Sequence, residues 1–438
     1  MEKELQKILL SYTSKNFVQK LYDLRTKVCE KATFNPRSNE GIKVAEIIDK
    51  VRVDGDKAVA DYTRQFDNTK LLPSQFIIPK EDLKKAHQQI DKKLLSSIRK
   101  TIVNVKNYQK KIFIGARKNI SGSVGIRYTA IKRVGICVPG ASAPLPSTVI
   151  MTAVPAQVAG VKEIVVVSPP RCNGSIHPVT LAVCFELGIN EVYRIGGVQA
   201  VAALAGGTDT IRLVEMIVGP GNQWVQTAKR LVYGQVKIDS LAGPSEVLII
   251  ADDNANPAYV AADMLSQAEH APGSALLFTP SKKLAQKVIG ELEKQVANLP
   301  RCSQTIQCLT QYSAVVIFKN IQQCIDWANK FATEHLEIQC GKNSRKIADK
   351  IQNAGAIFIG EYSPVAVGDY FAGPSHTLPT GGCARFSSAL TSNDFVKSIS
   401  IIEYDKKKLT KSADDIIRLA EAEGLDAHAK SVKVRLEK

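Results

Sequence analysis

The order of apolar and polar residues divides the chain into a helical first part and a longer part in which strands alternate with helices. Residues 1–32 are predicted to form a helical arm, and from Gly41 to Phe66 the apolar residues recur at helical spacing. From about residue 133, short apolar runs alternate with helical segments. The expected strands are 134–138, 163–168, 191–195, 215–218, 236–239, 246–251, 275–278, 314–318 and 356–359. Continuous apolar strands separated by helices are typical of parallel sheets covered on both faces, so the expected fold class is α/β.

The pattern changes again near the carboxyl end. After Ser392 there is one strand-like run, 399–404, followed by a helical pattern from about residue 410 to residue 435. These features predict a small separate domain over residues 392–438.

Glycine and proline follow several of the expected strands. Pairs of these residues stand at 139–140, 196–197, 219–220 and 243–244. In open α/β sheets, ligands bind at loops past the carboxyl ends of strands, so these turns are candidates for a dinucleotide-binding crevice. No G-x-G-x-x-G motif follows any strand. A nicotinamide cofactor would therefore bind in an unusual arrangement, and any single glycine here is more simply explained as a turn former.

Charge and composition exclude several classes of function. The chain of 438 residues carries 58 Lys+Arg against 42 Asp+Glu, a net charge of +16. The basic residues are dispersed and only 6% of residues are aromatic, so no nucleic-acid partner is expected. No apolar run of 18 residues occurs and the first residues lack the apolar core of a signal peptide, so we expect a cytoplasmic protein without a membrane partner. The nine cysteines form no CxxC pair, which favours reduced thiols.

Four histidines near the carboxyl end lie close to carboxylates or carboxamides. Gln267 and His270 are three residues apart at the end of a helical pattern, 257–270, so their side chains are expected to face the same way. Together with Asp369 and His428 they would supply nitrogen and oxygen ligands suited to zinc, although not to zinc alone. A lone histidine is more often a core or capping group. The recurrence of four such pairings favours a metal and acid/base site.

Glu334 and His335 are adjacent in the sequence. Taken alone, the pair is most simply an exposed polar pair at a helix end. Near the other candidates it suits acid/base chemistry, because an imidazole titrates close to neutral pH.

The assembled motifs closely resemble the histidinol dehydrogenase family, from about residue 40 to the end of the chain. The motifs that carry the resemblance are 51–56, 138–140, 142–144, 196–200, 218–222, 242–247, 266–270, 334–337, 368–370, 376–380, 384–388 and 423–428. They are many and specific.

The resemblance implies a role for each matching residue. Zinc, one ion per subunit, would be bound by Gln267, His270, Asp369 and His428. Glu334 and His335 would be the catalytic acid/base pair. L-Histidinol would contact Ser245, Gln267, His270, His335, Asp369, His376, Glu423 and His428. NAD would contact Gln199, Asn222 and Cys137, the last at a position where the family usually has tyrosine.

The resemblance also implies a fold and an assembly. The fold would have two large domains with incomplete Rossmann-like parallel sheets, similar to aldehyde dehydrogenases. Residues 33–136 and 245–391 would form the main domain, and 137–244 the domain that contacts NAD. Residues 392–438 would cross to the other subunit of a homodimer and supply His428 to the partner's site.

The implied reaction is the NAD-dependent oxidation of L-histidinol to L-histidine, by two successive hydride transfers through L-histidinaldehyde. One alternative is a paralogue that oxidises another small polar alcohol. The presence of both His376 and Glu423, which would contact the imidazole and the amine, favours histidinol. A zinc hydrolase is the other alternative, but it would have no use for the glycine-rich strand ends.

Overall fold

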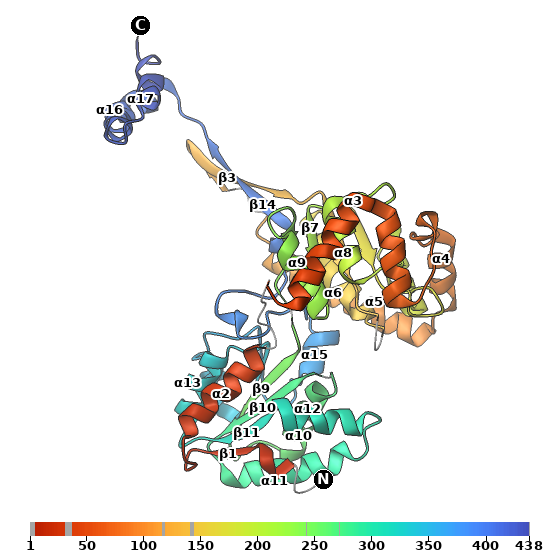
Figure 1. The fold of residues 1–438 in the computed structure, drawn as a ribbon. Coiled ribbons are helices and arrows are strands. Elements are labelled where there is room, and N and C mark those ends of the chain that lie inside the picture. The colour runs from red at the N-terminus through yellow and green to blue at the C-terminus, as the bar shows by residue number, and fades with distance from the viewer. Residues whose placement is uncertain are drawn as a thin grey trace. The chain divides into compact units, whose positions relative to one another are not determined.

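A computed structural model of the chain describes residues 5–30, 37–115, 119–140, 144–241, 243–270 and 272–437. Ser142, Ala143 and Ala242, which carry part of the family resemblance, lie outside these residues. The chain divides into two compact units (Figure 1). The first comprises residues 1–113 and 131–395, and the second residues 114–130 and 396–438.

One parallel sheet of the first unit has six strands in the order β1-β11-β10-β9-β12-β13. They are β1 (Leu9–Ser11), β9 (Glu246–Ala251), β10 (Ser274–Thr279), β11 (Ala314–Ile317), β12 (His335–Gln339) and β13 (Ala356–Ile359). Alternate residues of β9 enter two different apolar cores, Val247 and Ile249 on one face and Leu248 and Ile250 on the other. This is the burial on both faces that continuous apolar strands predict.

Helices cover both faces of the six-stranded sheet (Figure 1). One face packs against α10 (Pro257–Ala268), α11 (Lys282–Val296) and α12 (Cys302–Tyr312). The other packs against α2 (Phe17–Glu30), α13 (Ile321–Phe331) and α14 (Ser344–Ala348). The short helix α15 (Val365–Tyr370) follows β13.

The other parallel sheet of the first unit has five strands in the order β6-β5-β4-β7-β8. They are β4 (Arg133–Cys137), β5 (Glu163–Val167), β6 (Glu191–Tyr193), β7 (Met216–Val218) and β8 (Lys237–Ile238). The chain runs outward from β4 to β6 and then returns to the other side of β4 with β7. The order of strands therefore reverses between β4 and β7, and such a switch point is where open α/β sheets bind ligands.

The helices that cover the five-stranded sheet come from two parts of the sequence. The connecting helices are α6 (Pro146–Ala159), α7 (Pro178–Glu186), α8 (Gly197–Gly206) and α9 (Gln223–Val232). The earlier helices α3 (Asn39–Asp67), α4 (Lys80–Gln89) and α5 (Lys92–Ile112) pack on them, α3 against α8 and α9, α4 against α7, and α5 against α6. Residues 39–112 thus join the core of the five-stranded sheet, whereas the sequence analysis groups them with 245–391.

Several sequence expectations need correction in detail. The N-terminal arm contains a strand as well as a helix, because Leu9 and Leu10 extend along Val315 and Val316 of β11. The helix expected to continue to residue 435 is two helices, α16 (Lys406–Ala422) and α17 (Asp426–Lys433), interrupted at Gly424, whose φ is +70°. Strand β12 was not expected, because the predicted strands were continuous apolar runs and His335, Glu337 and Gln339 interrupt such a run.

The second unit joins two distant segments of the chain. Strand β3 (Val124–Ala130) pairs antiparallel with β14 (Val396–Ile402) on one side and with β2 (Asn119–Ser121) on the other. Helices α16 and α17 pack on each other. The small domain predicted over residues 392–438 corresponds to residues 396–438 of this unit, which also contains residues 114–130.

None of the helices in the described ranges is both long enough and apolar enough to cross a membrane. The cysteines that the structure describes outside α2 are free thiols.

A buried arginine ties together three strands of the five-stranded sheet. Arg133, which is 5% exposed at the start of β4, donates to Glu163 at the start of β5 at 3.0 Å and to Glu191 at the start of β6 at 2.8 Å. Tyr193 also donates to Glu191, at 2.9 Å. Burial alone would raise the pKa of Glu191, but these donors and the charge of Arg133 hold that pKa below its ordinary value.

We predict that this cluster makes the protein sensitive to acid. Because the folded-state pKa of Glu191 is lowered, its contribution to stability is complete above the unfolded-state pKa of about 4.5 and is lost as the pH falls below it. Glu191→Gln should lower the free energy of unfolding by about 1–3 kcal/mol at pH 7 and reduce its decline in acid. Urea unfolding across pH 3–7, with the exposed Glu361→Gln as control, measures both effects. Parallel pH curves for wild type and Glu191→Gln would contradict the prediction.

Candidate functional site

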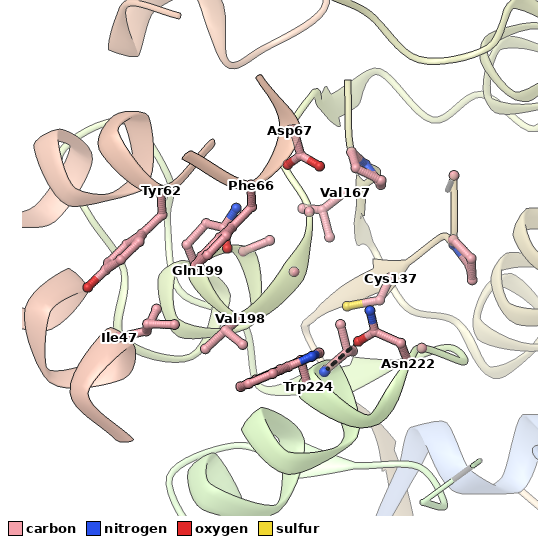
Figure 2. A pocket seen from close by; sticks show the side chains of 18 of the residues that line it. Ile47, Tyr62, Phe66, Asp67, Cys137, Val167, Val198, Gln199, Asn222 and Trp224 are labelled. Carbon is pink, nitrogen blue, oxygen red and sulfur yellow. Dashed lines mark hydrogen bonds between the residues drawn. The ribbon is translucent and has the colours of Figure 1, made fainter. Parts of the chain in front are cut away.

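A cavity of about 730 Å³ lies at the carboxyl ends of the strands of the five-stranded sheet (Figure 2). Its lining includes residues that directly follow β4, β5, β6 and β7: Val138, Pro139, Gly140, Pro169, Gly196, Gly197, Pro220, Gly221 and Asn222. Three of the four predicted glycine and proline turns, 139–140, 196–197 and 219–220, therefore converge on one space at the switch point of the sheet. The fourth, 243–244, does not line this cavity and precedes β9 of the six-stranded sheet. Gly196 and Asn222 are also the N-cap residues of α8 and α9, so two helix N-termini border the cavity.

One wall of the cavity comes from helix α3 and was not anticipated from sequence. Tyr62 and Phe66, four residues apart, stack with ring centroids 5.6 Å apart and line the cavity together with Ile47. Trp224, in the first turn of α9, also lines it (Figure 2). The helical spacing of Tyr62 and Phe66 can be read from the sequence, but nothing in the sequence places α3 beside α8.

The three residues proposed to contact NAD all line this cavity (Figure 2). Gln199 is fully buried, and neither its amide oxygen nor its amide nitrogen has a hydrogen-bond partner among the described residues. Asn222 accepts a hydrogen bond from the backbone N–H of Val225 at 3.1 Å, as an N-cap. Burial raises the pKa of the Cys137 thiol to about 12, which keeps it protonated. Two unpaired buried polar atoms facing a cavity are free to bind a polar ligand.

A buried ion pair holds the loop that carries Asn222. Lys229, with no exposed surface, pairs with Asp239 and donates to the carbonyl of Gly219 at 2.9 Å. Asp239 accepts from the backbone N–H of Gly219 at 2.7 Å. Gly219 itself passes so close to β4 that a Cβ would lie 2.2 Å from the carbonyl oxygen of Cys137. Both backbone polar groups of Gly219 are thus fixed, and the loop enters the cavity in one conformation.

The six-stranded sheet carries the Glu334–His335 pair, which is buried and not at a helix end. Glu334 directly precedes β12 and accepts hydrogen bonds from Ser245 Oγ at 2.5 Å and from the backbone N–H of Glu246 at 3.0 Å. His335 Nδ1 lies 3.0 Å from the carbonyl oxygen of Glu246. Because a carbonyl only accepts, Nδ1 must carry a proton. The other ring nitrogen, Nε2, lies 3.6 Å from an Asp369 carboxylate oxygen.

These neighbours shift the pKa values of the three groups. Burial raises the pKa of Glu334 above its ordinary value in spite of the nearby imidazole and Ser245. Burial lowers the pKa of His335, but the carboxylates of Glu334 and Asp369 raise it by more than burial lowers it, so the pKa is about 9. Burial would raise the pKa of Asp369, but His335, His376 and His270 lower it, so the net shift is downward. Glu334, His335 and Asp369 thus hold protons and charge in a region largely shielded from bulk water.

Two of the proposed zinc ligands lie on or just past helix α10, which ends at Ala268 and not at residue 270. Gln267 is buried, and its amide nitrogen has no hydrogen-bond partner among the described residues. His270 lies beyond the helix end and is exposed, within electrostatic range of Asp369 in α15. Among the described residues, no three His, Cys, Asp or Glu side chains are grouped closely enough to hold a metal ion. The nitrogen and oxygen donors that the first unit offers at this place are those of Gln267, His270 and Asp369.

His376 joins this region from the loop after α15. Its Nε2 lies 3.2 Å from Ser147 Oγ in the first turn of α6, and the neighbouring Ser375 donates to the carbonyl of Met151 at 2.9 Å. Burial lowers the pKa of His376, although the charge of Asp369 opposes the shift. His376 is thereby favoured in its neutral form.

The remaining proposed site residues belong to the second unit. Glu423 is the C-cap of α16, and His428 lies in α17. Both residues are exposed. The first unit alone thus brings together Ser245, Glu334, His335, Asp369 and His376, with Gln267 and His270 nearby in α10 and after it, whereas the second presents Glu423 and His428.

The architecture is shared with the aldehyde dehydrogenase class. A crystal structure of an acetylating aldehyde dehydrogenase from Geobacillus thermoglucosidasius aligns with a TM-score of 0.52 over 92% of this chain and 98% of that one, at 12% identity. This likeness concerns the fold alone. It confirms the expectation of aldehyde-dehydrogenase-like α/β domains.

The closer comparisons identify the family. The sequence profile of the histidinol dehydrogenase family matches residues 32–436. A histidinol dehydrogenase from Thermosynechococcus vestitus is 44% identical over 96% of this chain and 99% of that protein. A crystal structure of histidinol dehydrogenase from Elizabethkingia anophelis aligns with a TM-score of 0.90 over 98% of both chains, at 35% identity. The chain belongs to the histidinol dehydrogenase family and is an oxidoreductase.

Proposed function

We propose that the protein is an NAD-dependent zinc enzyme that oxidises L-histidinol to L-histidine through L-histidinaldehyde. Each oxidation transfers one hydride to NAD⁺, so two NAD⁺ are reduced per histidine formed. The observation that carries the proposal is the buried Glu334–His335 pair beside Asp369, in a chain that aligns with a histidinol dehydrogenase over almost its whole length. Its place in histidine biosynthesis, in the cytoplasm, follows from the same assignment.

NAD fits the cavity at the switch point of the five-stranded sheet. The N-termini of α8 and α9 present backbone N–H groups that the helices themselves cannot pair, which suit the pyrophosphate in place of a G-x-G-x-x-G turn. The aromatic wall of Tyr62, Phe66 and Trp224 suits a flat ring system. Gln199 has both amide atoms free for polar contacts with the cofactor. The cavity volume of about 730 Å³ falls in the range of ordinary ligand sites.

The donor chemistry around α10 and α15 fits zinc. Gln267 has a buried carboxamide not fully used in hydrogen bonding, Asp369 has a lowered pKa that keeps it ionised, and His270 supplies an imidazole. His428 would be the fourth ligand. When bound, zinc supplies a redox-inert positive charge that orients the substrate's amine and imidazole.

His335 is the proposed general base for the alcohol proton. Its Nδ1 is committed to the Glu246 carbonyl, so Nε2 is the atom that takes the proton. The carboxylates of Glu334 and Asp369 raise the pKa of His335 to about 9, so the ring is a strong base once Nε2 has given up its proton.

Glu334 is the proposed base for the water that adds to the aldehyde. A hydrated aldehyde gives up hydride readily, so the second oxidation depends on this addition. Burial raises the pKa of Glu334, which makes it a stronger base than an exposed carboxylate. Ser245 and the Glu246 N–H hold one of its oxygens in place.

The proposed assembly is a homodimer in which the second unit completes the partner's site. Several large apolar side chains of this unit are exposed: Ile402 (75%), Leu419 (68%), Leu425 (42%) and Val434 (45%). Exposed apolar surface of this kind marks an interaction site. A second copy of the chain is the partner that would use it while receiving His428 and Glu423.

A spectrophotometric assay tests the function directly. With L-histidinol and NAD⁺, the purified protein should produce two NADH per histidinol consumed, and L-histidine should accumulate. NADH formed only from another small polar alcohol would indicate a paralogue. Hydrolysis of an ester or amide without NAD⁺, and no NADH from any alcohol, would indicate a hydrolase.

Substitutions of the catalytic pair should affect the two oxidations differently. His335→Ala should lower kcat about 10²- to 10⁴-fold for both steps, the usual loss on removing a positioned base. Glu334→Gln should slow oxidation of L-histidinaldehyde while sparing its reduction by NADH, which needs no water. Glu361→Gln, an exposed substitution, serves as control. Equal small effects of Glu334→Gln and His335→Ala on both steps would show that the roles are misassigned.

Mixed dimers test whether the second unit crosses between subunits. His270→Ala and His428→Ala homodimers should each lose tight zinc binding and activity. A heterodimer of the two variants, isolated with two different tags, has one site with every ligand and one with two missing. It should recover up to about half of the native activity and bind one zinc. Verified heterodimers that remain inactive, or an active wild-type monomer, would contradict the exchange.

A further inference from the structure

Three buried polar residues lie below the candidate site and take no part in the proposed chemistry. Asp263, Glu337 and Gln339 are 9%, 1% and 3% exposed. The Gln339 amide nitrogen donates to Asp263 at 2.8 Å and to Glu337 at 3.1 Å. One amide therefore bridges the two carboxyl groups, and burial raises the pKa of both above their ordinary values. A proton held by the pair keeps two neighbouring buried carboxyl groups from both being charged.

A third element of the fold joins this cluster through its backbone. The N–H of Val365, the first residue of α15, donates to Glu337 Oε1 at 3.0 Å. This group is one of the N–H donors that a helix start leaves without an internal partner. Glu337 thus accepts from α15 with one oxygen and from Gln339 of β12 with the other, while Asp263 binds from α10.

Asp263, Glu337 and Val365 each lie one helical turn, or two strand residues, from a candidate site residue in the same element. On α10, Gln267 follows Asp263 by four residues and shares its face. On β12, His335 precedes Glu337 by two residues and points to the same side of the sheet, away from the core that takes Leu336 and Ile338. On α15, Asp369 follows Val365 by four residues. Three elements that carry site residues therefore meet at one buried carboxyl pair.

We propose that the Asp263–Glu337 pair is a positioning device that fixes α10, β12 and α15 in the relative placement zinc binding requires. The inference rests on the proposed zinc site. Packing alone gives no reason for the pair, because buried carboxyls cost free energy and apolar residues of similar volume usually serve stability as well or better. Burial and mutual repulsion raise the pKa of Glu337 well above its ordinary value, in agreement with a carboxyl that keeps its proton.

The test compares an apolar and a polar replacement of Glu337. In Glu337→Gln the amide nitrogen can donate to Asp263 and the amide oxygen can accept from the Val365 N–H. Only the bond from Gln339 to this residue is lost, so zinc affinity should stay close to wild type. Glu337→Leu has similar volume but neither bond, and zinc affinity should fall about 10- to 100-fold, as for other residues that orient metal ligands. Zn²⁺ competition against a chromogenic chelator measures affinity on the full-length protein, and thermal unfolding in EDTA verifies that each variant is folded without metal.

A second pair of variants removes only the link to α15. Val365→Pro is compatible with the first position of a helix and with the extended conformation of Pro364, but it lacks the N–H that Glu337 accepts. Val365→Ala loses as much side-chain packing and keeps that N–H. Zinc affinity should fall in Val365→Pro and stay near wild type in Val365→Ala. This pair decides the question if Glu337→Leu does not fold.

The outcomes separate the inference from the function on which it rests. Wild-type protein that binds no Zn²⁺ would overturn the zinc assignment itself. Wild-type protein that binds Zn²⁺, with equal affinity in folded Glu337→Leu or in Val365→Pro, would overturn the positioning role alone. Weak binding by Glu337→Leu with rescue by Glu337→Gln supports it.

Discussion

The parallel pairing of β9 with β12 is the constraint on which the candidate site depends. The register sets His335 opposite Val247, so Glu334, which precedes β12, must lie beside Ser245 and Glu246 at the start of β9. The side chain of Glu334 and the ring of His335 then use the hydroxyl, the N–H and the carbonyl of that neighbouring segment. A shift of one residue in the register would move His335 to the other face of the sheet and break all three contacts.

Buried charge recurs at both ends of the strands of the five-stranded sheet. Lys229 and Asp239 hold the backbone of Gly219 at the cavity, and Arg133 joins the beginnings of three strands. Such groups are expensive to bury and strongly destabilising when only one partner is removed. The first cluster therefore fixes backbone at the cavity, whereas the second holds the strands together at their opposite ends.

The sequence predicted what depends on local pattern. The apolar strands and helix α3 were found because burial on both faces, or on one helical stripe, leaves a period in the sequence. Strand β12 was missed because His335, Glu337 and Gln339 are polar yet buried, and they are the residues that line the site or support it. The aromatic wall of the cavity was missed because it depends on α3 packing against α8 across more than a hundred residues. The metal-ligand set and the Glu334–His335 pair could be proposed from residue chemistry and spacing, whereas the substrate and NAD contacts came only from the family resemblance.

The pairing of β3 with β14 has a consequence for how the protein is made. Ala130 is synthesised more than two hundred residues before its partner Val396. Until Val396 has been made, β3 has an unpaired edge, of the kind that invites wrong pairing with another chain. The small unit can form only after residues 396–402 have been synthesised, so products truncated before them would keep an unpaired strand edge and depend most heavily on chaperones.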